Sequence, residues 1–184
     1  SCIPAITVPA GSVMMSSKDP GTLGIYGFRN RADYGYGNLA IANNTAVKEP
    51  RVWDILGQAG KEVVLVGVPQ IKPVNGVCIT DFLTPSLADG FTYPEPLAEQ
   101  LLALAPRYEV DVKNFRTPDK DWLIRQLWDM TEMRFKVLDH LMETRPWDYF
   151  MWVEIGVDRI HHGLWSYMDP THRKYEAGNP YEDK

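Results

Sequence analysis

Residues 61–67 read KEVVLVG, a run in which β-branched and aliphatic residues follow one another without polar alternation. A strand with one solvent-exposed face alternates apolar and polar residues, so this run predicts a strand that is buried on both faces. Strands of that kind occur in parallel sheets that helices cover. The run therefore indicates an α/β protein with a mostly parallel central sheet.

The segments around this run alternate between helical and extended patterns. The predicted elements are a helix over 13–17 entered through Pro9, a helix over 51–59 ended by Gly60, the strand over 61–67, a strand over 77–82, a helix ending near 105, a helix over 119–144 and a strand over 147–154. Residues 19–27 and 167–184 are predicted to be irregular because glycine, proline and charged residues dominate them. This order is typical of a sheet with covering helices.

Length and composition indicate one folded domain. The chain has 184 residues, of which 45% are hydrophobic and 23% charged, as in an ordinary globular protein. Its net charge of -5 argues against a duplex nucleic acid as partner, because such a partner needs a basic surface. A small phosphorylated substrate stays compatible with this charge, since bound metal ions add positive charge that a residue count omits.

The two cysteines, Cys2 and Cys78, are too few for a disulfide scaffold, so we expect reduced thiols and a cytoplasmic location. No apolar run approaches the roughly 18 residues of a membrane span. The opening residues also lack the basic region of a signal peptide. Because the chain starts at Ser1 rather than at a methionine, these observations concern this segment alone. Nothing in the sequence indicates the oligomeric state.

Thr7 is the first candidate for chemistry. It lies in the stretch ITVPA, residues 6–10, directly before a predicted helical turn. The start of a helix presents unpaired N–H groups and a partial positive charge, which favour a phosphoryl group. An alcohol at that point is well placed to attack phosphorus once a metal ion or a base activates it. The alternative is that Thr7 is a helix N-cap without a chemical role.

Asp158 and His162 form the second candidate. They are four residues apart and follow a predicted strand, so one helical turn would bring both to the same ion. Carboxylate and imidazole suit zinc or manganese, and ligands collect at the carboxyl ends of strands in open α/β sheets. The alternative is that His161 or His162 packs against Trp165 or hydrogen-bonds a carbonyl, while Asp158 caps the turn.

Together the two segments resemble the type I phosphodiesterase/nucleotide pyrophosphatase family of the alkaline phosphatase superfamily. Residues 7–28, TVPAGSVMMSSKDPGTLGIYGF, resemble the nucleophile block of that family, and residues 158–162 resemble its D-x-x-G-H metal motif. The resemblance covers most of the chain. The sequence departs from the pattern at Ser16-Ser17, where many relatives have T-G, at Leu23, where they have histidine, and at His161, where they have glycine.

The resemblance implies a three-layer alkaline phosphatase-like sandwich, of which this chain forms an N-terminal portion. It also implies two divalent metal ions, zinc or manganese, with Asp158 and His162 among their ligands. Thr7 would then attack phosphorus, and water would hydrolyse the phospho-threonine intermediate. Arg29 and Asn30 follow the block where relatives place a phosphate-binding asparagine, so we predict substrate contacts there; the alternative is a solvated turn.

The family's other metal ligands would lie upstream of Ser1 and beyond Lys184. We therefore expect residues 1–184 to form one incomplete catalytic domain, which binds metal weakly or not at all and is inactive alone. The implied reaction is hydrolysis of a phosphodiester or pyrophosphate bond, with nucleotides as candidate substrates.

Other activities of the superfamily remain open: a phosphomonoesterase, a phosphonate hydrolase or a phosphotransfer mutase would use a similar threonine and metal pair. A sulfatase fits less well, because its nucleophile derives from a cysteine or serine. A different class of protein is a noncatalytic binding or scaffold module. In that case Thr7 caps a helix, and an aromatic cluster forms core or partner surface, namely Trp147, Tyr149, Trp152 and Trp165.

Overall fold

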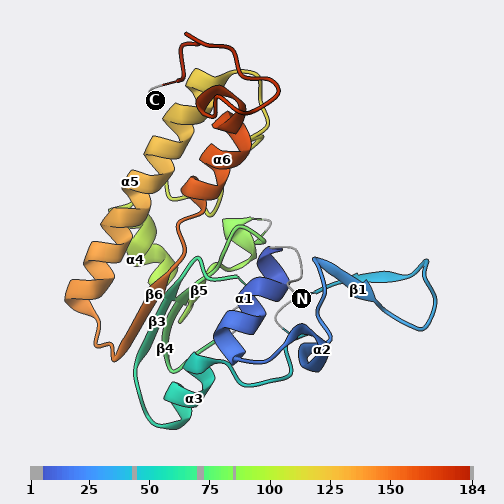
Figure 1. The fold of residues 1–184 in the computed structure, drawn as a ribbon. Coiled ribbons are helices and arrows are strands. Elements are labelled where there is room, and N and C mark those ends of the chain that lie inside the picture. The colour runs from blue at the N-terminus through green and yellow to red at the C-terminus, as the bar shows by residue number, and fades with distance from the viewer. Residues whose placement is uncertain (1–5, 43–44, 70–72, 85, 183–184) are drawn as a thin grey trace.

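A four-stranded sheet forms the centre of the computed structural model, which describes residues 6–42, 45–69, 73–84 and 86–182 (Figure 1). The strands lie in the order β5 (Thr92–Tyr93), β4 (Gly76–Ile79), β3 (Val63–Val66) and β6 (Tyr149–Trp152). β3 pairs in parallel with both β4 and β6, and β5 is the antiparallel edge strand. The predicted α/β class with a mostly parallel sheet is confirmed.

The central strand β3 explains the unbroken apolar run of the sequence. All four of its residues are buried. Val63 and Leu65 pack with Trp53 on one face of the sheet. Val64 and Val66 pack on the other face, in a cluster that includes Val137. Both faces of β3 are therefore buried from solvent, as a run without polar alternation requires.

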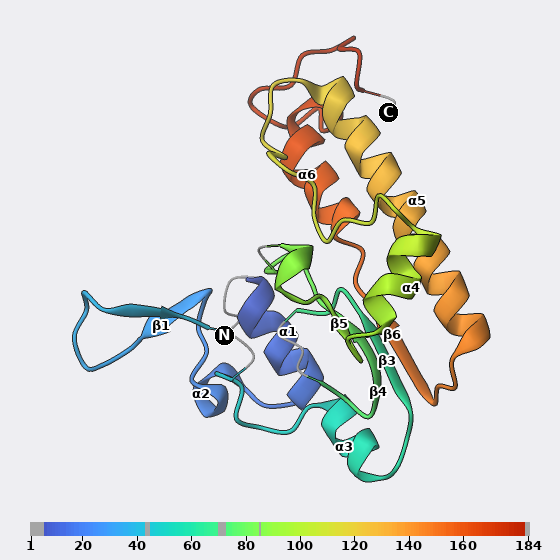
Figure 2. The ribbon, with the colours of Figure 1, turned by 180° about the vertical axis from the view of Figure 1, so that it is seen from behind.

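Helices cover both faces of the sheet and make three layers (Figures 1 and 2). Side chains from α1 (Thr7–Ser16) and α3 (Val52–Gln58) pack with one face. Side chains from α4 (Leu97–Leu104) and α5 (Lys120–Thr144) pack with the other. The last helix, α6 (Ile155–Met168), packs along α5 beyond the edge of the sheet where β6 ends. None of the described helices combines the length and apolarity that a bilayer span requires.

Gly76 fixes the entry into β4. Its φ of +131° is a backbone conformation that residues with a side chain rarely adopt. A Cβ atom there would also lie 2.2 Å from the carbonyl oxygen of Val63 on the neighbouring strand. The close pairing of β3 and β4 therefore requires a glycine at this position.

Several boundaries differ from the sequence-based expectation. The helix expected over 13–17 begins already at Thr7, because Pro9 fits within a first helical turn. The stretch 19–27, expected to be irregular, contains a short helix, α2 (Pro20–Leu23), and a 3₁₀ turn, η1 (Leu87–Asp89), precedes β5. A two-stranded hairpin, β1 (Arg29–Arg31) with β2 (Leu39–Ile41), was not predicted, since its residues are mostly exposed and show no apolar alternation.

The segment after β6 also differs, because a whole helix of 14 residues replaces the single helical turn that we expected. Its fit against α5 depends on Gly163, where an added Cβ would lie 2.5 Å from the Leu123 side chain. Cys78 is buried and free, whereas Cys2 lies outside the described residues. Trp147, Trp152 and Trp165 are each close to half exposed, so they do not form core.

Candidate active site

The junction between β6 and α6 positions the predicted metal-binding pair. Glu154 caps α6, its carboxylate accepting a hydrogen bond from the Gly156 amide at 2.8 Å. Asp158 lies in the first turn of the helix and His162 one turn later, with 3.7 Å between His162 Nε2 and Asp158 Oδ2. Both side chains are about half exposed, at 52% for His162 and 44% for Asp158. The two candidates therefore share one face of α6, and the alternative that Asp158 caps the turn is wrong.

This geometry suits two donors of one metal ion. Zinc ligands lie about 2.1 Å from the ion, so two neighbouring donors of a tetrahedral site are about 3.4 Å apart. The observed separation of 3.7 Å needs only a small adjustment of either side chain. Within residues 6–42, 45–69, 73–84 and 86–182, no group of three or more His, Cys, Asp or Glu side chains is placed to hold an ion. A catalytic zinc uses three protein ligands, and the structure places two candidate donors, Asp158 and His162, side by side.

Arg159 orients the Asp158 carboxylate. One guanidinium nitrogen donates to Asp158 Oδ2 at 2.6 Å, while two others donate to the Asp111 carboxylate at 2.8 and 2.5 Å. The guanidinium carbon lies 4.3 Å from the Phe115 ring centroid and 5.2 Å from that of Phe82. Burial lowers the pKa of Arg159, but its bonds to Asp111 and its attraction to both carboxylates outweigh this effect, so the pKa is raised. A buried, fully charged group therefore holds one oxygen of Asp158 in place.

Arg159 and Asp111 were not predicted as parts of the site. Arg159 lies within the motif, but Asp111 is 48 residues away in an irregular segment. The sole sequence signal was an arginine directly beside the candidate ligand, and no spacing rule connects it with Asp111. The pairing depends on how the segment before α5 folds back onto α6.

The other histidine of the motif, His161, has a packing role. The His161 ring contacts Trp165 edge-on, with 5.4 Å between the ring centroids, so the alternative that we considered holds for this residue. His162 instead lies beside Phe115, at a centroid distance of 5.7 Å, and keeps its Nε2 atom on the side of Asp158. Of the two adjacent histidines, His162 is the one whose ring nitrogen lies near the Asp158 carboxylate.

Thr7 is the first residue of α1 and is exposed. Ile6 occupies the N-cap without a side-chain hydrogen bond, so the alternative that Thr7 is the N-cap is wrong. The first intrahelical bond runs from the Ala10 amide to the Ile6 carbonyl at 3.0 Å. The amides of Thr7 and Val8 precede it and have no acceptor within the helix, while Pro9 has no N–H. The hydroxyl of Thr7 therefore lies next to backbone amides that can bind an anion.

The two halves of the candidate site face the same edge of the sheet. Both α1 and α6 begin towards the edge where β3 and β6 end, and η1 lies between them in both views (Figures 1 and 2). No hydrogen bond or ion pair joins Thr7 to Asp158 or His162 in the described part of the chain.

Arg29 and Asn30 lie apart from the other candidates. They belong to β1, in the hairpin that extends away from the sheet and from α6 (Figure 1). Among the described residues, no hydrogen bond or ion pair joins their side chains to Thr7, Asp158 or His162. The structure brings Asp158 and His162 together, and it leaves the substrate contacts of Arg29 and Asn30 a prediction.

A comparison with protein-family models matches residues 1–177 to the type I phosphodiesterase / nucleotide pyrophosphatase family. The chain belongs to this family. The match covers nearly all of the 184 residues, and it confirms the resemblance drawn from the two sequence motifs. Comparisons with curated proteins and with solved structures found no match.

Membership in the type I phosphodiesterase/nucleotide pyrophosphatase family identifies the class of activity. The family consists of phosphodiesterase- and pyrophosphatase-type hydrolases within the alkaline phosphatase superfamily. The helix-covered, mostly parallel sheet is consistent with an N-terminal part of the alkaline phosphatase-like fold.

Proposed function

We propose that this chain contributes a nucleophile and two metal ligands to a site that hydrolyses phosphodiester or pyrophosphate bonds, with nucleotides as substrates. The observation that carries the proposal is the Asp158–His162 pair, whose donor atoms are 3.7 Å apart on α6 at the carboxyl end of β6. The family match supports the hydrolase class. The position of Thr7 at an exposed helix start supports its role as nucleophile.

Each residue has a distinct task in this proposal. Asp158 and His162 supply an oxygen and a nitrogen donor to a divalent cation, zinc or manganese, and Arg159 keeps Asp158 oriented. Two such cations, when bound, would activate the nucleophile and neutralise charge on the phosphoryl oxygens. The open amides at the start of α1 hold the phosphoryl group near the Thr7 hydroxyl.

The reaction proceeds in two displacements. Thr7 Oγ1 forms a bond to phosphorus and gives up its proton, while the bond from phosphorus to the leaving oxygen breaks; the leaving oxygen keeps the electron pair of that bond and takes up the proton, through solvent. Water then attacks the phospho-threonine, breaks the bond between Thr7 Oγ1 and phosphorus, and returns a proton to the hydroxyl. The products are an alcohol or phosphate leaving group and a phosphomonoester.

Hydrolysis of bis(p-nitrophenyl) phosphate by the longest natural form of the protein tests the role of Thr7. Thr7→Ala removes the nucleophile, so we expect kcat to fall on the order of 10³-fold or more, with zinc affinity and unfolding midpoint unchanged. Thr144→Ala is the matched control, because Thr144 is an exposed threonine at the far end of α5. A rate for Thr7→Ala equal to that of the control would refute the nucleophile.

Zinc titration tests the ligand pair separately. Asp158→Asn and His162→Gln keep the size of each side chain, and we expect each to weaken zinc binding by about 10- to 100-fold or more. His161→Gln changes the adjacent histidine, which packs on Trp165, and should leave the affinity unchanged. We propose further that residues 1–184 alone bind zinc weakly, since two protein donors do not complete a catalytic zinc site. Equal zinc affinities of the parent protein and of the Asp158→Asn, His162→Gln and His161→Gln variants would contradict the assignment of Asp158 and His162 as ligands.

A further inference from the structure

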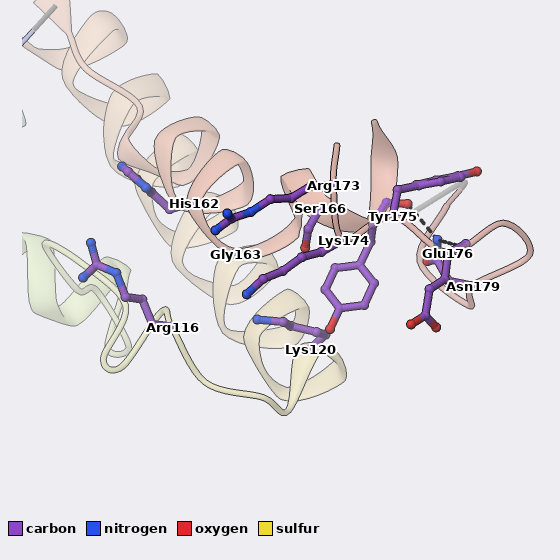
Figure 3. Close-up of a pocket in the computed structure, with 11 residues that line it drawn as sticks. Arg116, Lys120, His162, Gly163, Ser166, Arg173, Lys174, Tyr175, Glu176 and Asn179 are labelled. Carbon is purple, nitrogen blue, oxygen red and sulfur yellow. Dashed lines mark hydrogen bonds between the residues drawn. The ribbon is translucent and has the colours of Figure 1, made fainter. Parts of the chain in front are cut away.

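A cavity of about 650 Å³ opens beside the candidate metal ligand His162 (Figure 3). It lies between the segment that leads into α5, the second half of α6 and residues 173–179. His162 and Gly163 from α6 form part of its wall. The cavity therefore adjoins the proposed metal site, but most of its lining comes from residues to which we have assigned no role.

Positive charge dominates this cavity. Four of its lining residues have basic side chains, namely Arg116, Lys120, Arg173 and Lys174, and Glu176 is the one acidic residue among the lining side chains that the structure describes. The charged ends of Lys120, Arg173 and Lys174 point into the same space (Figure 3). The chain as a whole carries a net charge of -5, so the cluster opposes the overall charge. The cavity therefore concentrates a positive potential that favours anions.

Lys120 shows that this charge is not fully neutralised within the protein. The side chain is buried, and its Nζ donates one hydrogen bond, to the Thr117 carbonyl oxygen at 2.6 Å. An ammonium group has three donors, so that bond leaves two for other acceptors. Burial lowers the pKa of Lys120. Among the described residues no carboxylate forms an ion pair with any of the four cations.

We propose that this cavity is an anion-binding subsite for phosphate groups other than the one that reacts. Arginine forks bind phosphate oxygens in pairs, and lysine ammonium groups bind them as point charges, so the two kinds of side chain suit a chain of phosphates. The volume accommodates a few phosphate groups but no nucleic acid duplex. The inference rests on the proposed hydrolytic function for its link to catalysis, whereas anion binding itself does not depend on that function.

Calorimetric titration of the chain with inorganic pyrophosphate in EDTA tests the subsite without metal. Arg173→Gln/Lys174→Gln removes two exposed cations of the cavity. We expect this variant to bind pyrophosphate at least about 10-fold more weakly than the parent, and we expect added salt to reduce the difference. Lys18→Gln/Arg125→Gln is the matched control, since it removes two exposed cations outside the cavity. Equal affinity of both double variants for pyrophosphate would overturn the subsite.

Two further measurements separate this inference from the proposed function and identify the source of the anion. Thr7→Ala should keep the parent's pyrophosphate affinity, whatever its effect on hydrolysis.

If the cavity holds phosphates of the substrate, Arg173→Gln/Lys174→Gln raises KM for ATP at least about 10-fold and leaves KM for bis(p-nitrophenyl) phosphate unchanged. If the cavity holds phosphate released by the reaction, the same double variant is inhibited less by pyrophosphate than the parent, while its KM values for both substrates stay the same. Either pattern supports the subsite, and a rise in both KM values with unchanged pyrophosphate affinity contradicts it.

Discussion

Replacing Arg159 with methionine should destabilise the protein strongly. Methionine keeps much of the length of arginine but removes the guanidinium that bonds Asp111 twice and Asp158 once. The side chain is 8% exposed, and its charged end also lies over the ring of Phe115. The substitution therefore leaves two carboxylates close together without the cation between them.

The exposure of the partners sets the magnitude. Removing one partner of a fully buried ion pair costs about 3–5 kcal/mol, whereas a solvent-exposed pair contributes about 0–1 kcal/mol. Asp111 is 21% exposed and Asp158 is 44% exposed, so water compensates part of the loss. We expect Arg159→Met to lower the free energy of unfolding by about 2–3 kcal/mol, with most of the loss arising at Asp111.

Urea unfolding followed by tryptophan fluorescence measures this change, provided the m-value stays constant. Arg107→Met is the matched control, because Arg107 pairs with Asp129 at 3.4 Å with both side chains exposed, and it should change the free energy by less than about 0.5 kcal/mol. In a double-mutant cycle, Arg159→Met and Asp111→Asn should show a coupling energy of about 1–3 kcal/mol. A coupling energy near zero, or equal effects of the two arginine substitutions, would refute the argument.

Three further substitutions test the backbone conformation at two glycines and the ionisation of one carboxylate. Gly76→Ala should lower the free energy of unfolding by about 2–4 kcal/mol in urea, because its Cβ meets a strand carbonyl at 2.2 Å and its φ is positive. Gly11→Ala, within helix α1, adds a Cβ that meets no atom within 4 Å apart from its neighbours in the helix, and should instead raise it by about 0.5–1 kcal/mol. The Glu62 amide lowers the pKa of Asp148 below 3.8, so the folded state gains stability from the ionised carboxylate above that pH and loses it as the pH falls. Asp148→Asn should therefore lower the urea midpoint at neutral pH, with a difference from the parent that shrinks in acid; a constant difference would contradict this.

Patterns among neighbouring residues were enough to predict much of the fold. The run 61–67 predicted a strand buried on both faces, and β3 has that environment. The apolar spacing over 119–144 predicted α5 to within one residue at its start. Such signals are local, because the period of apolar residues follows directly from the geometry of one strand or helix.

The same reasoning applies to the pair that we propose as metal ligands. A spacing of four residues places Asp158 and His162 on one helical face wherever the segment is helical, so their contact was predictable. The hairpin of β1 and β2 was not, since its exposed residues carry no periodic apolar signal. Local periodicity is informative only where one face of an element is buried.

Sequence alone thus determined the α/β class, the family and the two candidate motifs, because each depends on residues close together in the chain. The bonds of Arg159 to Asp111, across 48 residues, depend on the path of the chain between them. So does the cationic cavity, which joins Arg116 and Lys120 to Arg173 and Lys174. The sequence around a charged residue does not indicate which distant residue it will contact. These contacts exist only because α6 and the residues after it pack against the start of α5.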